Sequence, residues 1–488
     1  MHKSSIKKNF FYQCIYEILI ILLPLLTSPY LARVLGAEQV GIYSYTYSIA
    51  YFFMMFACLG VKNYGNRTIA AVRDDQNELN KTFSNIYAVM IMLATIVSAV
   101  YVVYAVFFSE YRIIAFIQFI YILSCFVNID WFFFGIEEFR LTVTRNSIVK
   151  LITVVAIFIF VRDQGDLWKY CLILALGTLI GQAAVWYFLK DYVQFVRPSW
   201  EEMKKHIKPL FVLFIPVLAV SLYKYMDKIM LGILSTKTQV GFYENSEKVI
   251  NIPTSIITAF GTVMLPRMSN LAAGGSRKQI KDYIERSQEL VLCLALALAF
   301  GLAGVAQNFS VIFWGSEFEP CGNLIIALAV TIPFISYANV IRTQFLVPQK
   351  WDRPYIVSVF TGAGVNIVAN LILIQRYEAL GAAFGTIFAE AAVCLVQAFY
   401  VRKELPVLKY VRKAIYFLII GVVMFVVVMT IGNMGVHIHV LLLQILVGAV
   451  VYSLFSLIYF IVTKNQTVLP IIDKMLVRLH LKSNTKKD

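Results

Sequence analysis

Fourteen long apolar runs, separated by short polar segments, constrain this chain more than any other feature of its sequence. A helix needs about 20 apolar residues to cross a hydrocarbon core of about 30 Å, and the runs are close to that length. Strands of a membrane barrel would be shorter and would alternate in polarity. We therefore predict an all-α polytopic membrane protein with fourteen transmembrane helices. The runs lie at approximately 10–32, 40–61, 83–107, 113–134, 146–162, 168–189, 209–233, 246–266, 287–313, 323–345, 355–375, 380–401, 413–433 and 438–462.

The composition leaves little chain for anything except membrane spans. Apolar residues make up 60% of the sequence and charged residues 15%, against about 45–50% and 25% in soluble proteins. No phosphate-binding loop, H-E-x-x-H or G-x-S-x-G pattern stands out, and the seven Cys and five His form no ligand spacing. We therefore expect a transporter rather than an enzyme, with no catalytic residues, no cofactor and no metal site.

The basic residues are distributed very unevenly among the loops. The net charge is +15, and 33 of the 43 Lys and Arg fall on the side of the predicted spans that holds the N-terminus, against seven on the other side. Cytoplasmic loops of membrane proteins collect Lys and Arg. We therefore predict a multi-pass protein of the cell membrane with both termini cytoplasmic. The charge reflects topology, and no nucleic-acid partner is expected.

An internal repeat links the two halves of the chain. The sequence of residues 39–43, Gln-Val-Gly-Ile-Tyr, recurs at residues 239–243 as Gln-Val-Gly-Phe-Tyr, and Arg67 matches Arg267 at the same offset. Copies with an even number of spans share one orientation, and two such lobes usually bind substrate between them. We therefore predict two parallel six-helix bundles followed by two C-terminal helices. The expected segments are 1–208 for the first bundle, 209–402 for the second, and 403–488 for the last two helices and a basic cytoplasmic tail.

Charged residues inside the seventh run mark a candidate site, because charges at membrane depth are costly and usually functional. Lys224, Asp227 and Lys228 share one helical face by their spacing of three and four. One carboxylate can neutralise one ammonium only, so a surplus positive charge is expected there. Such a face suits a phosphate or pyrophosphate. The alternative is a cluster that snorkels toward an interface.

Other polar residues in the spans are weaker candidates. Arg342 and Gln344 in the tenth run could form a second contact with an anionic substrate, although Arg342 could equally snorkel. Glu17 and Glu390 could serve as counter-ions, proton carriers or cation ligands, and an inter-helix pair explains each of them equally well. Asp130 ends the fourth run and is expected to fix a helix end or a gate.

Several short motifs, taken in order, resemble those of the polysaccharide (Wzx-type) flippases. This is the oligosaccharide flippase family of the multidrug/oligosaccharidyl-lipid/polysaccharide exporter superfamily. The resemblance covers about residues 9–400, and its motifs are specific by their order and spacing rather than singly. They are Asn9-Phe10, Pro24-Leu25, Pro29–Gly36, Gly41–Tyr43, Ile129–Glu137, Asp227–Gly232, Gly241–Tyr243, Asn366, Asn370, Gly381–Ala383, Thr386 and Glu390.

The resemblance implies both a substrate and a process. The substrate would be an undecaprenyl-pyrophosphate-linked oligosaccharide repeat unit, moved from the cytoplasmic to the outer leaflet by alternating access. The pathway would be capsule, O-antigen or exopolysaccharide assembly, with polysaccharide polymerase and assembly proteins as further candidate partners besides the lipid bilayer. A cation-coupled multidrug extruder of the same fold is the first alternative. A membrane glycan polymerase or ligase is the second, although such enzymes carry large external loops and the loops predicted here are short.

Overall fold

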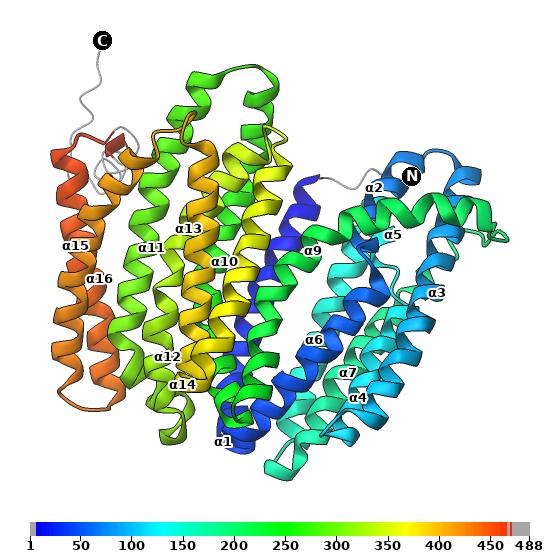
Figure 1. The fold of residues 1–488 in the computed structure, drawn as a ribbon, viewed down its shortest axis with the longest axis horizontal. Helices are drawn as coiled ribbons and strands as arrows, with labels where there is room; N and C mark the ends of the chain where they lie inside the picture. Colours follow the sequence, from blue (N-terminus) through cyan, green and yellow to red (C-terminus); the bar gives the residue numbers. More distant parts are fainter. Residues whose placement is uncertain (1–5, 466–468, 471–488) are drawn as a thin grey trace. The chain divides into compact units, whose positions relative to one another are not determined.

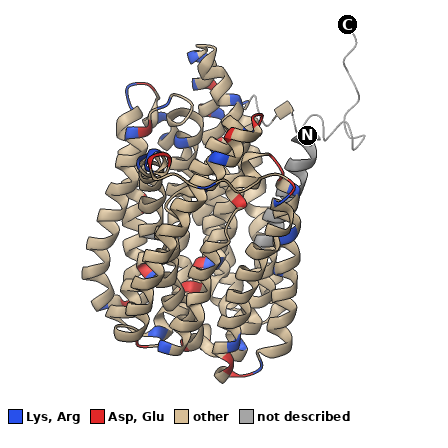
Figure 2. Cartoon of the chain, turned by 90° about the vertical axis from the view of Figure 1, so that its right-hand side faces the viewer, with Lys and Arg blue, Asp and Glu red and all other residues tan. Residues whose placement is uncertain are grey.

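The computed structural model describes residues 6–465 and 469–470, with side chains from Leu22 onward except that of Tyr223. Within these residues the chain forms helices and no strands. Twelve of the helices are long and apolar enough to cross a membrane. Figure 2 shows that most charged residues lie toward the helix ends and that a few lie midway along the helices. The chain is therefore a multi-pass membrane protein, as the apolar runs predicted.

Two of these twelve spans each contain two of the predicted apolar runs. In α1 (Ile6–Cys58), Gly36 breaks the helical backbone at φ 77° and ψ 171°, a conformation open essentially to glycine. In α14 (Asp352–Val401), Glu378 interrupts the helix at φ 50° and ψ −126°. A 53-residue helix would extend about 80 Å, far beyond one bilayer. Each break therefore falls where the sequence analysis placed a loop between two spans.

The residues fall into two compact units, each described by itself. The first comprises 1–248 and 363–385, and the second comprises 249–362 and 386–488. These ranges differ from the three segments expected from the repeat, and the expected tail lies largely outside the described residues. The division into two six-helix bundles stays a prediction.

The first unit contains α1 to α9, the start of α10 and the middle of α14 (Figure 1). Its core is rich in aromatic side chains, and Phe83, Trp131, Phe132 and Phe133 are fully buried there. Besides α1, its elements are α2 (Val61–Val72), α3 (Gln76–Phe107), α4 (Arg112–Phe126), α5 (Asp130–Gly135), α6 (Phe139–Phe160), the 3₁₀ helix η1 (Gln164–Asp166), α7 (Leu167–Ala184), α8 (Trp186–Leu189), α9 (Trp200–Leu234) and α10 (Lys237–Ala273).

The second unit contains the rest of α10 and α14 with the helices between and after them. Buried amides join α16 to α11, since Asn308 Nδ2 donates to Gln444 Oε1 at 3.1 Å. The elements of the second unit are α11 (Arg277–Trp314), the 3₁₀ helix η2 (Ser316–Phe318), α12 (Pro320–Ala329), α13 (Thr331–Ile341), the π-helix η3 (Arg342–Leu346), α15 (Val407–Gly432) and α16 (Ile438–Val462).

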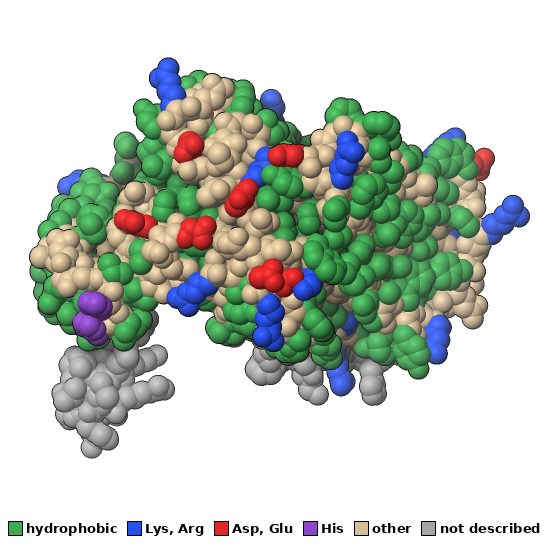
Figure 3. All heavy atoms as spheres, turned by 90° about the horizontal axis from the view of Figure 1, so that it is seen from below, with side chains coloured by type: hydrophobic (Ala, Val, Ile, Leu, Met, Phe, Trp, Pro, Cys, Tyr) green, Lys and Arg blue, Asp and Glu red, His purple; other side chains and the backbone are tan. Residues whose placement is uncertain are grey.

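In the view from below, acidic and basic side chains of the chain lie among hydrophobic ones (Figure 3).

Candidate functional site

The two copies of the repeated sequence touch each other within the first unit. A Cβ atom placed on Gly41 of α1 would lie 1.6 Å from the carbonyl oxygen of Lys237. A Cβ atom on Gly241 of α10 would lie 2.0 Å from the carbonyl oxygen of Ala37. Both contacts pair equivalent positions of the two copies, as in a two-fold symmetric interface. Glycine at both positions therefore allows the two helix backbones to cross in direct contact.

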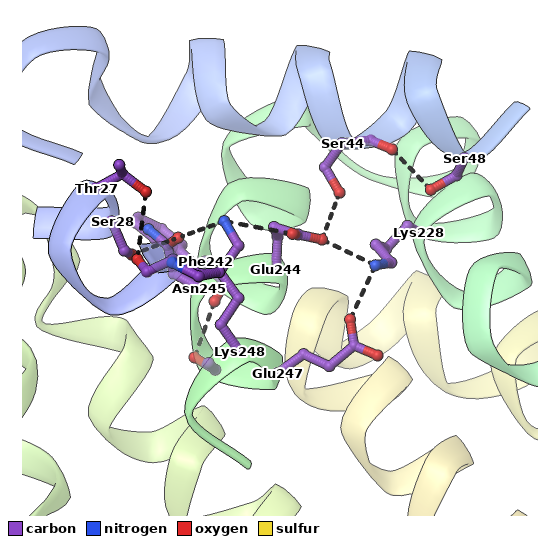
Figure 4. A network of polar contacts seen from close by, with 12 residues as sticks. Thr27, Ser28, Ser44, Ser48, Lys228, Phe242, Glu244, Asn245, Glu247 and Lys248 are labelled. Carbon is purple, nitrogen blue, oxygen red and sulfur yellow. Dashed lines mark hydrogen bonds and ion pairs between the residues drawn. The ribbon is translucent and has the colours of Figure 1, made fainter. Parts of the chain in front are cut away.

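A buried ion-pair cluster lies beside this crossing (Figure 4). Lys228 Nζ of α9 lies 2.8 Å from Glu244 Oε2 and 2.9 Å from Glu247 Oε2 of α10. Ser44 Oγ of α1 donates to Glu244 Oε2 at 2.8 Å, and Lys248 Nζ lies 3.3 Å from Glu244 Oε1. The Lys228 side chain is only 8% exposed. At Lys228 the expected surplus positive charge is therefore absent, because α10 supplies carboxylates that balance it.

The sequence analysis missed Glu244 because it began the eighth span at residue 246, and it did not single out Glu247 at the start of that span. Helix α10 begins at Lys237, so both carboxylates lie inside the helix. Their spacing of three places them on one helical face, which is a signal that could have been found. That both would face Lys228 could not be inferred, since these ion pairs join separate helices.

Asp227 lies on the same helix as Lys228 but has different partners. Tyr243 Oη donates to Asp227 Oδ2 at 2.8 Å, and Asn370 Nδ2 of α14 donates to Asp227 Oδ1 at 2.6 Å. Asn370 Nδ2 also lies 3.3 Å from Asn366 Oδ1. All four side chains are buried or nearly so. Asp227 is therefore part of a hydrogen-bonded contact between three helices.

Lys224 differs from Lys228 in being exposed and, among the described residues, without a carboxylate within ion-pair distance. Its Nζ lies 5.9 Å from the ring centre of Tyr225. Ten residues separate Lys224 from the end of α9 at Leu234, which is about 15 Å at the rise of an α-helix. Lys224 therefore lies within α9, well before its C-terminal end, and its side chain is exposed.

The candidates of the second unit occupy the π-helix and α14. Arg342 lies with its guanidinium 5.8 Å from the ring centre of Tyr355. Gln344 is fully buried, and neither its amide nitrogen nor its oxygen has a partner among the described residues. Glu390 is 8% exposed and has a partner. A π-helix turn often marks a functional position, and the roles of these three residues stay predictions.

The last two candidates lie in the first unit. Asp130 begins α5, and its Oδ2 lies 2.9 Å from Arg145 Nη2 and 3.3 Å from Gln182 Nε2. It therefore joins the start of α5 to α6 and α7. Glu17 falls in α1, and its side chain lies outside the described part. Among the described residues no three His, Cys, Asp or Glu side chains gather as a metal site would require.

Comparison with known proteins relates the chain to a family and to a fold. Two curated relatives, from Shigella dysenteriae and Escherichia coli, are each described as a candidate O-antigen transporter. The first is 23% identical over 378 residues, which is 77% of this chain and 94% of that protein. The second is 23% identical over 416 residues, which is 83% of this chain and 98% of that protein.

Two solved structures share the fold at low sequence identity. A lipid II flippase MurJ in its inward closed conformation superposes with a TM-score of 0.75 at 14% identity, covering 92% of this chain and 99% of that one. An inward-facing multidrug resistance MATE family transporter gives 0.62 at 11% identity, covering 82% and 99%. The model of the polysaccharide biosynthesis protein family matches residues 6–272. The chain therefore belongs to the polysaccharide biosynthesis protein family, and its expected place among the Wzx-type flippases is confirmed.

Proposed function

We propose that this protein is a flippase for undecaprenyl-pyrophosphate-linked oligosaccharide repeat units. It moves them from the cytoplasmic to the outer leaflet for capsule, O-antigen or exopolysaccharide assembly. Family membership supports this proposal, as do relatives described as candidate O-antigen transporters. The single structural observation that supports it is the exposed side chain of Lys224 within the long helix α9, without an ion-pair partner among the described residues.

The chemistry of such a substrate fits that lysine. A pyrophosphate is the charged part of a lipid-linked glycan, and transferring it through a bilayer is costly. Lys224 would offset part of this cost by placing a cation on α9 about 15 Å from the C-terminal end of that helix. Lys228 contributes less directly, since Glu244 and Glu247 already hold it. Arg342 and Gln344 are proposed as further contacts on the second unit.

Movement of the substrate would follow from the repeated architecture. We propose fourteen spans in two six-helix bundles plus a final pair, with both termini cytoplasmic. The breaks at Gly36 and Glu378 support this number, because each divides a helix that is too long for one crossing. The bundles would alternate between an inward-open and an outward-open arrangement. Glu17, Glu390 and Asp130 are proposed to couple or gate that change.

A cation-coupled multidrug extruder is the alternative that the carboxylates favour. Three carboxylates lie near three lysines in this part of α9 and α10. The carboxylates are Asp227, Glu244 and Glu247, and the lysines are Lys224, Lys228 and Lys248. The charge of this region alone does not separate the two functions. A functional assay must therefore include both classes of substrate.

The test is complementation of flippase-deletion strains that make chemically different repeat units. We expect the protein to restore surface polymer in at least one strain, with no gain in resistance to cationic dyes. Lys224→Ala and Arg342→Ala should each abolish this polymer at normal membrane protein levels, and Lys224→Arg should retain part of it. Dye resistance without polymer in any strain would overturn the proposal in favour of the extruder. Sugar transfer by the purified protein alone would favour a polymerase or ligase.

A further inference from the structure

Six tyrosines from four helices of the first unit form a continuous series of ring contacts, here called the tyrosine strip. Three of them follow one face of α1 at a spacing of four residues, which is the spacing of neighbours on a helix. The other three come from α4, α7 and α9. The members are Tyr43, Tyr47, Tyr51, Tyr121, Tyr170 and Tyr225.

The rings of the strip are arranged as a ladder. The ring centres of Tyr43 and Tyr47 lie 5.6 Å apart with the planes 15° from parallel. Those of Tyr47 and Tyr51 lie 6.4 Å apart, and Tyr51 stacks on Tyr225 at 3.9 Å. Tyr121 makes an edge-on contact with Tyr47, and Tyr170 makes an edge-on contact with Tyr43. The strip therefore connects α1 to α9, with Tyr121 and Tyr170 buried and the other four rings partly exposed.

The residue type of the strip is unusual for a purely structural cluster. The chain has 37 Phe and 28 Tyr, yet every ring of the strip is a tyrosine. Among the described residues, the hydroxyls of Tyr47, Tyr51 and Tyr225 have no hydrogen-bond partner. None of these three hydroxyl oxygens is fully buried. The three residues are partly exposed. Since an unpaired buried hydroxyl is costly, these hydroxyls are placed where a ligand or water can reach them.

One end of the strip meets the lysines of α9. Lys228 Nζ lies 5.2 Å from the ring centre of Tyr225, and Lys224 Nζ lies 5.9 Å from it. A ligand that places an anionic group at Lys224 would therefore extend its remaining part along the tyrosines. The Tyr225 end of the strip and the exposed ammonium of Lys224 therefore lie next to each other in the first unit.

We propose that the tyrosine strip binds the sugar rings of a pyrophosphate-linked glycan whose anionic group lies at Lys224. This inference rests on the proposed function and extends it to the glycan part of the substrate. The C–H face of a pyranose is weakly positive and packs on the electron-rich face of an aromatic ring. The tyrosine hydroxyls can donate to and accept from sugar hydroxyls. A series of similar tyrosine–sugar contacts accepts different sugars, since each contact depends on the ring shape of the sugar.

A flat aromatic cation is the other ligand that an aromatic surface attracts. Lys224 opposes it, because its ammonium lies 5.9 Å from the Tyr225 ring centre and has no ion-pair partner among the described residues, whereas Lys228 is neutralised by Glu244 and Glu247. A neutral glycan with an anionic end has no such conflict. The observations therefore favour the glycan.

The experiment measures binding of synthetic polyprenyl-pyrophosphate glycans with one sugar or with several sugars to the purified full-length protein in detergent. The wild type should bind the longer glycan more tightly. Tyr47→Leu should reduce this gain by roughly two- to tenfold, the range expected for one aromatic contact. Tyr47→Phe should retain most of the gain, because the ring remains. Tyr416→Leu, an exposed tyrosine of α15 outside the strip, is the matched control and should behave as wild type.

The outcomes separate this inference from the proposed function. If the wild type binds both glycans and Tyr47→Leu leaves the gain from added sugars intact, the tyrosine strip is not the glycan site and the flippase proposal stands. If the wild type binds neither glycan, both proposals fail. Tight binding of a cationic dye that Tyr47→Leu abolishes would overturn the inference as well. Thermal unfolding of each variant checks that lost binding does not reflect a lost fold.

Discussion

Replacement of Lys228 by methionine tests the ion-pair cluster most sharply. The substitution keeps the length and the apolar part of the side chain, and it removes the cation that lies within 2.9 Å of both Glu244 and Glu247. Removing one partner of a buried ion pair costs about 3–5 kcal/mol. Solvent screens this pair little, since the Lys228 side chain is 8% exposed. Lys248 still lies 3.3 Å from Glu244, so we expect a loss near the lower end, about 3 kcal/mol.

A double-mutant cycle isolates the charge effect. Glu247→Gln alone leaves Lys228 paired with Glu244 and should cost about 1.5–3 kcal/mol, the value of a hydrogen bond to a charged group. The double variant Lys228→Met/Glu247→Gln keeps the Glu244–Lys248 ion pair, and it leaves no unbalanced charge in the cluster. It should therefore be more stable than Lys228→Met alone. The coupling must then exceed the cost of Glu247→Gln alone, so we expect it in the upper part of the range seen for residues in direct contact, about 2–3 kcal/mol.

Denaturant unfolding of the four proteins in one detergent, followed by tryptophan fluorescence, gives these differences. Where unfolding is irreversible, the order of apparent midpoints replaces the free energies. A double variant that loses the sum of the two single losses would refute the reasoning, because the two side chains would then act independently.

Two further predictions follow from the fold. Gly41→Ala should lower the unfolding midpoint strongly, since the added Cβ would lie 1.6 Å from the carbonyl oxygen of Lys237. In the control Gly364→Ala the added Cβ has no neighbour within 4 Å, so this variant should be neutral or stabilised by up to about 1 kcal/mol. Equal stability of the two would contradict the helix crossing. Lys413→Met should destabilise the packing of α15 on α11 because it leaves Glu289 buried, whereas Lys409→Met should cost at most about 1 kcal/mol, its side chain being 55% exposed. Thermal scans of both variants check this order, and a reversed order would refute it.

Much of the fold could be predicted from hydrophobic runs, because a bilayer demands apolar helices of a certain length. The run lengths did not predict that α10 extends back to Lys237, since the charged residues of its first turns lower the local hydropathy. The repeat of residues 39–43 at 239–243 was visible in the sequence, but the contact of Gly41 with the second copy depends on tertiary packing.

The candidate site was predicted less completely. Spacing placed Lys224, Asp227 and Lys228 on one helix, and it could not supply their partners on α10 and α14. The tyrosines at 43, 47 and 51 share a helical spacing, but the stacking of Tyr51 on Tyr225 joins residues far apart in the chain. Local patterns identify residues that face the interior, and only the packed structure shows which of them meet.

The central claim is that this protein moves a lipid-linked glycan across a bilayer, with Lys224 as a contact to its anionic group. The direct measurement uses liposomes that contain the purified protein and the repeat unit that supports polymer in the complementation test, with movement between leaflets followed by a membrane-impermeant sugar-modifying reagent. We predict movement well above that of protein-free liposomes, a loss of at least tenfold in Lys224→Ala, and partial activity in Lys224→Arg. Movement no faster than in protein-free liposomes would contradict the flippase assignment, and full activity in Lys224→Ala would contradict the role of Lys224.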